Sequence, residues 1–256
     1  MSADSRLTPL ASVLDEARRL GTLGEASGVR ARLLGGVGVA LHAHGQIPGP
    51  LARVYGDLDY VVRRSDAPAF RRLLETSGYE ANERFNALHG HRRLLHYDLV
   101  NGRQVDTFVG YFKMCHALDL DERLPLDGLS IAPGDLLLTK LQIVQVNDKD
   151  LRDVLALLGD HAVGSGPEAV DATRIAAIVG HDWGWYTTLL DNLEKLEERR
   201  RFIAGLEPDL RARLADRICE IRAVVAGARR SLRWRARAAV GRRVPWYELP
   251  EEVAAR

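Results

Sequence analysis

The stretch Asp57-Leu58-Asp59-Tyr60-Val61-Val62 decides how the rest of the chain is interpreted. Its β-branched and aromatic residues are typical of a strand. Side chains along a strand alternate between its two faces, with a rise of roughly 3.3 Å per residue, so residues two apart share a face. We therefore expect Asp57 and Asp59 to point to one side of a sheet, and Leu58 and Tyr60 to point to the other.

The two carboxylates of this stretch repel each other unless a cation lies between them. Mg²⁺ prefers oxygen ligands and often shares protein carboxylates with substrate phosphates. Asp57 and Asp59 thus form a candidate half-site for a metal-bound nucleoside triphosphate. A solvated Asp-x-Asp at a strand edge is the alternative interpretation.

Two glycines lie upstream, between a short strand expected at Arg30–Leu34 and a helix expected at Val37–Ala43. Gly35 and Gly36 allow backbone N–H groups to approach a phosphate at a helix N-terminus, where anions are favoured. A plain tight turn is the alternative for this pair.

A hairpin is expected downstream, because Asn101-Gly102 lies between strands at Leu94–Val100 and Gln104–Val109. Asp106 in the second strand adds a third carboxylate. It can complete a two-metal site and accept the proton of an attacking hydroxyl. Asp98 in the first strand is a weaker candidate for that role, and an exposed strand carboxylate is the alternative for Asp106.

The remaining pattern divides the chain into a mixed first part and a helical second part. Helices are expected at Leu7–Leu20, Ala67–Thr76 (capped by Asp66), Gly134–Val146, Lys149–Leu158, Thr187–Ile203 and Pro208–Ala239. We expect an α+β fold, with a mixed sheet and flanking helices, over residues 1–160. A C-terminal helical region is expected over residues 161–256.

The order strand, Gly-Gly, helix, acid-pair strand and later acid strand resembles the nucleotidyltransferase superfamily, which has the DNA polymerase β-like fold. Leu34-Gly35-Gly36 and Asp57-Leu58-Asp59-Tyr60 match the two motifs of that superfamily, separated here by a somewhat long gap. The resemblance covers residues 30–160.

A finer resemblance is to the AbiEii-type nucleotidyltransferases, the toxin members of bacterial abortive-infection pairs. Lys140-Leu141 on one helix and Lys149-Asp150-Leu151-Arg152-Asp153 at the start of the next match their pattern. Arg53, four residues before Asp57, also matches, whereas Tyr55 departs from the Thr or Ser found in that family.

The finer resemblance implies a role for each of these residues. Lys140 would reach triphosphate oxygens as a point charge, or it is a snorkelling lysine on an apolar helix. Arg53 and Asp150 would contribute to nucleotide binding. Asp150 would position Lys140 or the base, or it caps its own helix. Asp153 can pair with Lys149 four residues before it.

The resemblance implies a Mg²⁺-dependent nucleotidyltransferase that uses ATP or another nucleoside triphosphate. Asp57, Asp59 and Asp106 would hold the metal, in a two-metal arrangement. Gly35-Gly36 would cradle phosphate and Lys140 would add charge. An acceptor hydroxyl would attack the α-phosphorus and release pyrophosphate, with Asp106 as the base.

The acceptor stays open among RNA, a protein side chain and a small molecule such as an aminoglycoside. A toxin would act together with an antitoxin partner. The second hypothesis is a non-catalytic nucleotide- or RNA-binding module with the same fold.

The bulk properties fit these expectations. The 256 residues are 46% hydrophobic, and the net charge of +1 makes no case for or against nucleic acid. Cys115 and Cys219 are too few for a disulfide framework or a cysteine zinc site. Without a signal segment or membrane span in the sequence, we expect a cytoplasmic protein with no membrane partner.

Histidines at positions 42, 44, 89, 91 and 96 fit no standard zinc spacing and are expected in loops and on the surface. His181–Tyr186 concentrates aromatic side chains, either for packing between helices or for base stacking. The basic run Arg229–Arg243 contains Trp234 and is either a solvated helix face or a grip on a phosphate backbone.

Overall fold

The computed structural model describes residues 8–43, 47–124 and 128–249. These residues form two compact units, which are described separately below. The first comprises residues 8–43, 54–112, 119–124 and 128–131, and the second comprises residues 47–53, 113–118 and 132–249. The expected division of the chain at residue 160 stays a prediction.

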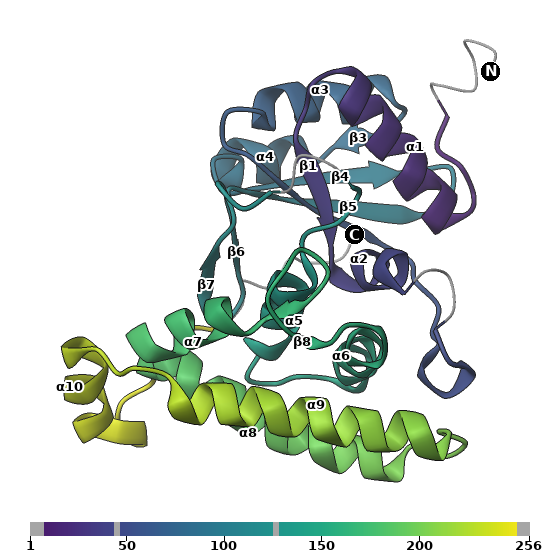
Figure 1. The fold of residues 1–256 in the computed structure, drawn as a ribbon. Helices are drawn as coiled ribbons and strands as arrows, with labels where there is room; N and C mark the ends of the chain where they lie inside the picture. Colours follow the sequence, from purple (N-terminus) through teal and green to yellow (C-terminus); the bar gives the residue numbers. More distant parts are fainter. Residues whose placement is uncertain (1–7, 44–46, 125–127, 250–256) are drawn as a thin grey trace. The chain divides into compact units, whose positions relative to one another are not determined.

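The first unit is built on a five-stranded mixed sheet (Figure 1). Its strands, in spatial order, are β1 (Ala31–Leu34), β2 (Leu58–Val62), β5 (Arg103–Val109), β4 (Arg93–Asp98) and β3 (Glu80–Ala81). Only β2 and β5 run parallel to each other; the other neighbours are antiparallel. The expected α+β class with a mixed sheet and flanking helices is confirmed.

One face of the sheet carries the hydrophobic core of this unit. Leu58, Tyr60 and Val62 of β2 are buried there, together with apolar residues of α1 (Val13–Ala26) and α3 (Ala67–Thr76). Because side chains alternate along β2, Asp59 lies on the opposite face, as its sequence pattern predicts.

The hairpin and the elements around it follow the sequence closely. The strands on either side of Asn101-Gly102 pair in the antiparallel register Asp98↔Arg103, so the predicted hairpin is confirmed. The helix α3 has the expected bounds and Asp66 is its N-cap residue, but the Asp66 side chain makes no capping hydrogen bond. Its carboxylate instead accepts the backbone N–H of Arg30 at 3.0 Å.

The first two helices begin at different residues from those expected. α1 begins at Val13, because the side chain of Ser12 caps it by accepting the N–H of Asp15; Leu7 lies outside the described residues. The helix α2 (Gly35–His42) begins at Gly35 rather than at Val37, so both glycines belong to its first turn. A short helix, α4 (Glu83–His89), lies against β4.

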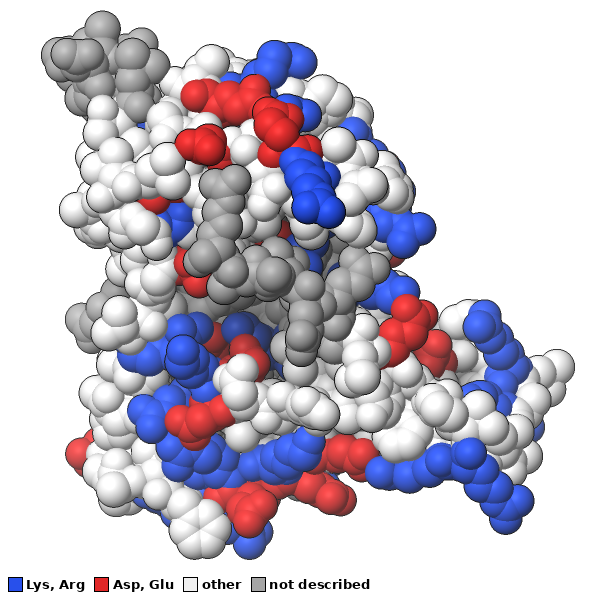
Figure 2. Space-filling view, turned by 180° about the vertical axis from the view of Figure 1, so that it is seen from behind, with Lys and Arg blue, Asp and Glu red and all other residues white. Residues whose placement is uncertain are grey.

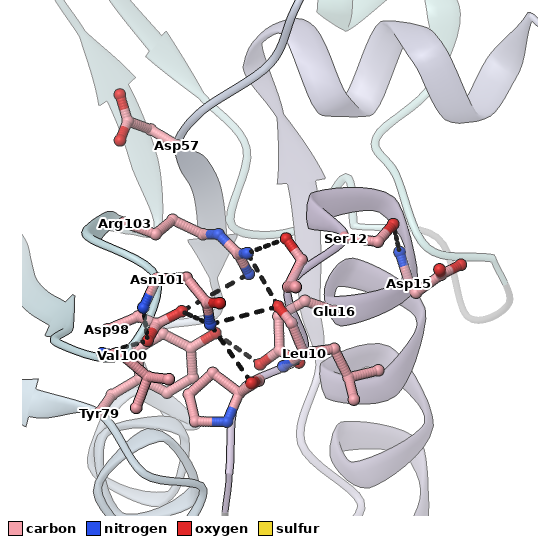
Figure 3. Close-up of polar contacts among 12 residues, drawn as sticks. Leu10, Ser12, Asp15, Glu16, Asp57, Tyr79, Asp98, Val100, Asn101 and Arg103 are labelled. Atoms are coloured by element: carbon pink, nitrogen blue, oxygen red, sulfur yellow. Dashed lines mark hydrogen bonds and ion pairs between the residues drawn. The ribbon is translucent and has the colours of Figure 1, made fainter.

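Buried polar contacts attach α1 and the segment before it to the rest of the first unit (Figure 3). The carboxylate of Glu16 is fully buried and pairs with Arg19 at 2.7 Å, while the hydroxyl of Tyr79 donates to it at 2.5 Å. Arg103, just after the hairpin turn, donates to the carbonyl oxygens of Leu10 and Ala11, each at 2.9 Å. The hairpin therefore holds the chain segment that leads into α1.

The second unit is mostly helical. Its helices are α5 (Pro133–Leu141), α6 (Asp148–Asp160), α7 (Ala172–His181), α8 (Trp183–Phe202), α9 (Pro208–Gly227) and α10 (Leu232–Val240), with short 3-10 turns η2 (Gly49–Leu51) and η3 (Gly241–Arg243). A parallel pair, β8 (Val163–Gly164) and β9 (Val170–Asp171), joins α6 to α7. The chain crosses between the units within β6 (Tyr111–Lys113) and β7 (Ala117–Asp119), which pair with each other.

The helix expected over Pro208–Ala239 is wrong, since the chain breaks between α9 and α10. The break packs closely on α7. A Cβ added at Gly180 would lie 2.4 Å from the carbonyl oxygen of Arg229, and the N–H of Ser231 donates to the oxygen of Gly180. The hydroxyl of Ser231 then caps α10 by accepting the N–H of Trp234. Tertiary packing and a new cap thus override a helical sequence pattern.

The helix expected over Gly134–Val146 is also too long, because α5 ends at Leu141. Among the described residues, none of the helices combines the length and the apolar character needed to cross a lipid bilayer.

The expectation that His96 lies on the surface is wrong. It is fully buried in β4, and neither ring nitrogen has a hydrogen-bond partner in the described part of the chain. Burial lowers the pKa of His96 to about 4. The unfolded chain therefore binds a proton that the folded chain does not as the pH falls from about 6.5 to about 4.

We predict that protonation of His96 destabilises the protein in acid. Between about pH 7.5 and about pH 4.5, the unfolding free energy of the natural protein should fall further than that of His96→Leu. The difference between the two decreases should be about 2–3 kcal/mol. Urea unfolding followed by circular dichroism measures it. His116, whose pKa burial also lowers to about 4, is present in both proteins and cancels in the comparison. Equal acid sensitivity of the two proteins would contradict the prediction.

Candidate functional site

The acidic residues of the first unit meet on one face of the β2–β5 pair. Asp59 and Asp106 are direct partners in the parallel register, so their side chains point the same way from neighbouring strands. Asp57 comes just before β2, where it is exposed and accepts the backbone N–H of Gln104 at 3.2 Å. In Figure 3 its carboxylate points away from the Glu16 contacts.

The backbone of Gly35 approaches the Asp59 carboxylate very closely. Gly35 has a φ of +67°, and a Cβ added there would lie 2.1 Å from the Asp59 Oδ2 atom. Only glycine therefore fits at this first residue of α2 without moving the carboxylate. No side chain of the described residues caps the start of α2, whose N-cap residue is Leu34. Gly36 follows in the first turn and is buried.

Asp106 is paired with a cation that sequence reasoning missed. Arg93 donates from Nε to Oδ1 of Asp106 at 2.7 Å and makes a second, shorter bond to Oδ2. The Arg93 guanidinium also lies over the ring of Phe108, 5.1 Å from its centroid. The hairpin register predicts this pairing, because Leu95 lies opposite Asp106 and Arg93 is its diagonal neighbour.

The environment of Asp106 raises the pKa of its carboxyl group. Burial raises the pKa of Asp106 above its ordinary value, the hydrogen bond and charge of Arg93 oppose this rise, and the charge of Asp57 adds to it. The net direction is upward, because the side chain is only 6% exposed. A carboxyl group with a raised pKa is better suited to accept a proton than a fully solvated one.

Asp98, the weaker candidate for that role, has a different function in the fold. It is fully buried and accepts the backbone N–H groups of Val100 and Asn101, each at 3.0 Å. Its carboxylate therefore holds the hairpin turn.

The predicted residues of the second unit meet in an ion-pair cluster of their own. The Lys140 ammonium lies 2.7 Å from Asp150 and 2.9 Å from Asp153. Arg53 donates two hydrogen bonds to Asp153, each at 2.7 Å. Burial lowers the pKa of Lys140, but the charges of Asp153 and Asp150 outweigh it, so the net pKa is raised and the ammonium keeps its proton.

Two local expectations change in this cluster. The start of α6 is capped by Asn147, which accepts the N–H of Asp150, so Asp150 is not the cap and instead orients Lys140. Asp153 pairs with Lys140 and Arg53 rather than with Lys149. The predicted contact of Lys140 and Arg53 with a triphosphate stays a prediction.

A family model described as "Uncharacterised nucleotidyltransferase" matches residues 10–152, more than half of the chain. The chain belongs to this nucleotidyltransferase family. No curated protein matches the chain. The matched segment contains Gly35, the three acidic residues of the first unit and Lys140.

Membership in this family confirms the superfamily resemblance that the sequence order predicts, and it supports nucleotidyl transfer as the general activity, with a nucleotide as substrate. The finer resemblance to the AbiEii-type toxins stays a prediction.

We predict that Gly35→Ala destabilises the first unit and displaces Asp59. The matched control is Gly102→Ala, because Gly102 has the same φ of +67° but nothing within 4 Å of an added Cβ. Both variants carry the backbone strain of about 1 kcal/mol, and Gly35→Ala should lose at least about 1–2 kcal/mol more. Urea unfolding of both variants measures the difference. Equal losses of unfolding free energy in the two variants would mean that the Asp59 carboxylate can move aside at no cost.

We also predict that Lys140→Met destabilises the second unit by about 3–5 kcal/mol, because it leaves two buried carboxylates without their shared cation. Lys149→Met is the control, since Lys149 is exposed on the same pair of helices and should change stability by less than about 0.5 kcal/mol. Thermal unfolding of the two variants tests this. A stable Lys140→Met protein would show that the cluster contributes little to the fold.

Proposed function

We propose that this protein transfers a nucleoside monophosphate from a nucleoside triphosphate to an acceptor hydroxyl at the acidic cluster of the first unit. The observation that carries the proposal is the alignment of Asp59 and Asp106 on one face of parallel strands, with the Gly35 backbone against Asp59. A phosphate-binding helix start and a carboxylate pair are thereby brought to the same place.

The donor set of this cluster fits Mg²⁺. Asp57 and Asp59 supply only oxygen atoms; Asp57 is exposed and Asp59 is half-buried, so both can share a cation with phosphate oxygens. The pair would hold one ion. A second ion would require Asp106 to exchange its bond with Arg93 for the metal. When bound, Mg²⁺ stabilises the negative charge that develops on the phosphates.

The glycines and the start of α2 would hold the triphosphate. The first N–H groups of a helix have no partner within the helix and favour anions. Because Gly35 has no side chain, the Asp59 carboxylate can approach this backbone, and a phosphate held at the start of α2 would lie beside that carboxylate. The chain thereby supplies both the carboxylates for a cation and the N–H groups for an anion.

The proposed step is an in-line displacement at the α-phosphorus. The acceptor oxygen forms a bond to the α-phosphorus, while the bond from that phosphorus to the bridging oxygen breaks and pyrophosphate leaves. The hydroxyl proton passes to Asp106, whose raised pKa suits it to accept a proton. Positioning and electrostatics would supply most of the rate enhancement.

The finer proposal is a toxin of the AbiEii type, with RNA or a protein as acceptor, whereas a small-molecule acceptor such as an aminoglycoside would suit a resistance enzyme. It is supported by the meeting of Arg53, Lys140, Asp150 and Asp153 in one cluster, since these are the residues on which that resemblance depends. An antitoxin partner and a cytoplasmic location belong to the same proposal.

A non-catalytic nucleotide-binding module is the second candidate. It is favoured by the pairing of Asp106 with Arg93, which already balances the buried carboxylate without a metal. In that case the protein would bind Mg²⁺ and nucleotide at Asp57 and Asp59 without transfer.

We predict that Asp59→Asn lowers transfer of label from α-labelled triphosphates by at least about 100-fold, because it removes a carboxylate that would hold the Mg²⁺ ion stabilising the charge that develops on the phosphates. The assay contains Mg²⁺ and pools of RNA, protein or aminoglycoside. Asp15→Asn is the control, because its carboxylate is exposed in the same unit and, among the described residues, forms an ion pair with the exposed Arg18 alone. Transfer that survives Asp59→Asn would remove this cluster from the reaction, and Mg²⁺-dependent binding without any transfer would favour the binding module.

A further inference from the structure

The second unit contains a pocket whose lining includes none of the acidic residues of the first. Its volume is about 400 Å³, within the range of small-ligand sites. It lies among the starts of α8 and α10, the segment 113–117 and the last described segment, residues 245–248. Its walls include Trp183, Trp234, Trp246 and Tyr247, together with Arg233 and Arg237. Aromatic and basic side chains therefore dominate this cavity.

The aromatic walls of the pocket are held in place by stacked arginines. The Arg237 guanidinium lies over the Trp183 ring at 4.8 Å, and that of Arg242 lies over Trp246 at 5.0 Å. The indole nitrogen of Trp246 also donates to the hydroxyl of Thr188 at 3.1 Å. The indoles of Trp183 and Trp246 are half-buried, so the walls are fixed and partly open to a ligand.

The carboxylates of the pocket are already engaged. Asp182 accepts the N–H groups of Gly184 and Trp185 at 2.7 and 3.1 Å, and Glu248 pairs with Lys113 at 2.6 Å. Arg233 is exposed and has no ion pair in the described portion of the protein. The charge left available to a ligand is therefore positive.

The positive charge continues along the chain on both sides of Arg233. Arg229, Arg235 and Arg243 likewise have no carboxylate partner within the described segments. Figure 2 shows basic side chains at the end of the second unit formed by α10, in the lower right of the view. None of the residues of α10 is buried. A row of phosphates can therefore meet several unpaired arginines.

We propose that this pocket binds a nucleotide of a single-stranded RNA, with its base against the tryptophans and its phosphate on Arg233. Bases stack on aromatic rings regardless of sequence, and arginines bind the backbone phosphates. The adjoining arginines of α10 would hold the neighbouring phosphates. An acidic peptide would use the charge but not the aromatic walls, so it fits this pocket less well.

The binding itself does not depend on transfer chemistry. That the bound RNA is the acceptor, however, rests on the proposed function. The two are separated by measuring binding with EDTA and without triphosphate, so that no transfer takes place.

The test is fluorescence anisotropy of a short labelled single-stranded RNA with the full-length protein. Arg233→Glu should weaken binding about tenfold or more, because it reverses a charge at a phosphate contact. Arg84→Glu is the matched control: it makes the same change at an exposed arginine of α4, in the first unit and outside the pocket, and should weaken binding less than about threefold. Equal losses in the two variants would overturn the proposal.

Three further ligands in the same assay identify the chemistry that the pocket binds. An abasic oligomer of the same length should bind more weakly than RNA, and equal binding would rule out stacking. Free AMP or a polyglutamate that competes as well as the RNA would also overturn the proposal, in favour of a mononucleotide or an acidic chain. Asp59→Asn should retain RNA binding. If no variant transfers label but Arg233→Glu still weakens RNA binding, the proposed RNA site in this pocket is supported and only the proposed transfer function is contradicted.

Discussion

The first unit depends on the parallel pairing of β2 with β5 in a sheet that is otherwise antiparallel. A parallel pair cannot be joined by a tight turn, so the chain between them forms α3, β3, α4 and β4 before it returns. That excursion covers one face of the sheet with α3 and completes the sheet with β4. It also brings two carboxylates that are 47 residues apart in sequence into direct register, as Asp59 and Asp106.

The two clusters balance buried charge in different ways. In the first unit, Arg93 pairs with the buried Asp106, and the exposed Asp57 and the half-buried Asp59 lie near this pair. In the second unit, Lys140 and Arg53 stand against Asp150 and Asp153, so the charges match. The first arrangement is the proposed ligand site, whereas the ion pairs of the second join α5 to α6.

Patterns with a local physical cause allowed much of this fold to be predicted. The alternation in β2 gave the face of Asp59, the Asn101-Gly102 turn gave the hairpin, and the glycines gave the start of α2 to within two residues. These signals depend only on backbone geometry and on residues close in sequence.

Features that depend on tertiary contacts were missed. The break before α10 arises from the packing of Arg229 on Gly180, and no residue type near the break predicts it from the sequence. The burial of His96 depends on which strands flank β4. The partner of Asp106 was accessible from the hairpin register but required Arg93 to be considered as a diagonal neighbour. The partners of Asp153 are Arg53, one hundred residues away, and Lys140, on the preceding helix.

That last separation has a consequence for synthesis on the ribosome. The segment that carries Arg53 belongs to the second unit, although it is translated between two parts of the first. Its partner Asp153 follows 100 residues later, which at common translation rates is about 5–20 s. During this interval the sheet of the first unit can already form, while Arg53 still lacks Asp153, which has not yet been translated. The order of translation therefore differs from the order in which the two units can be completed.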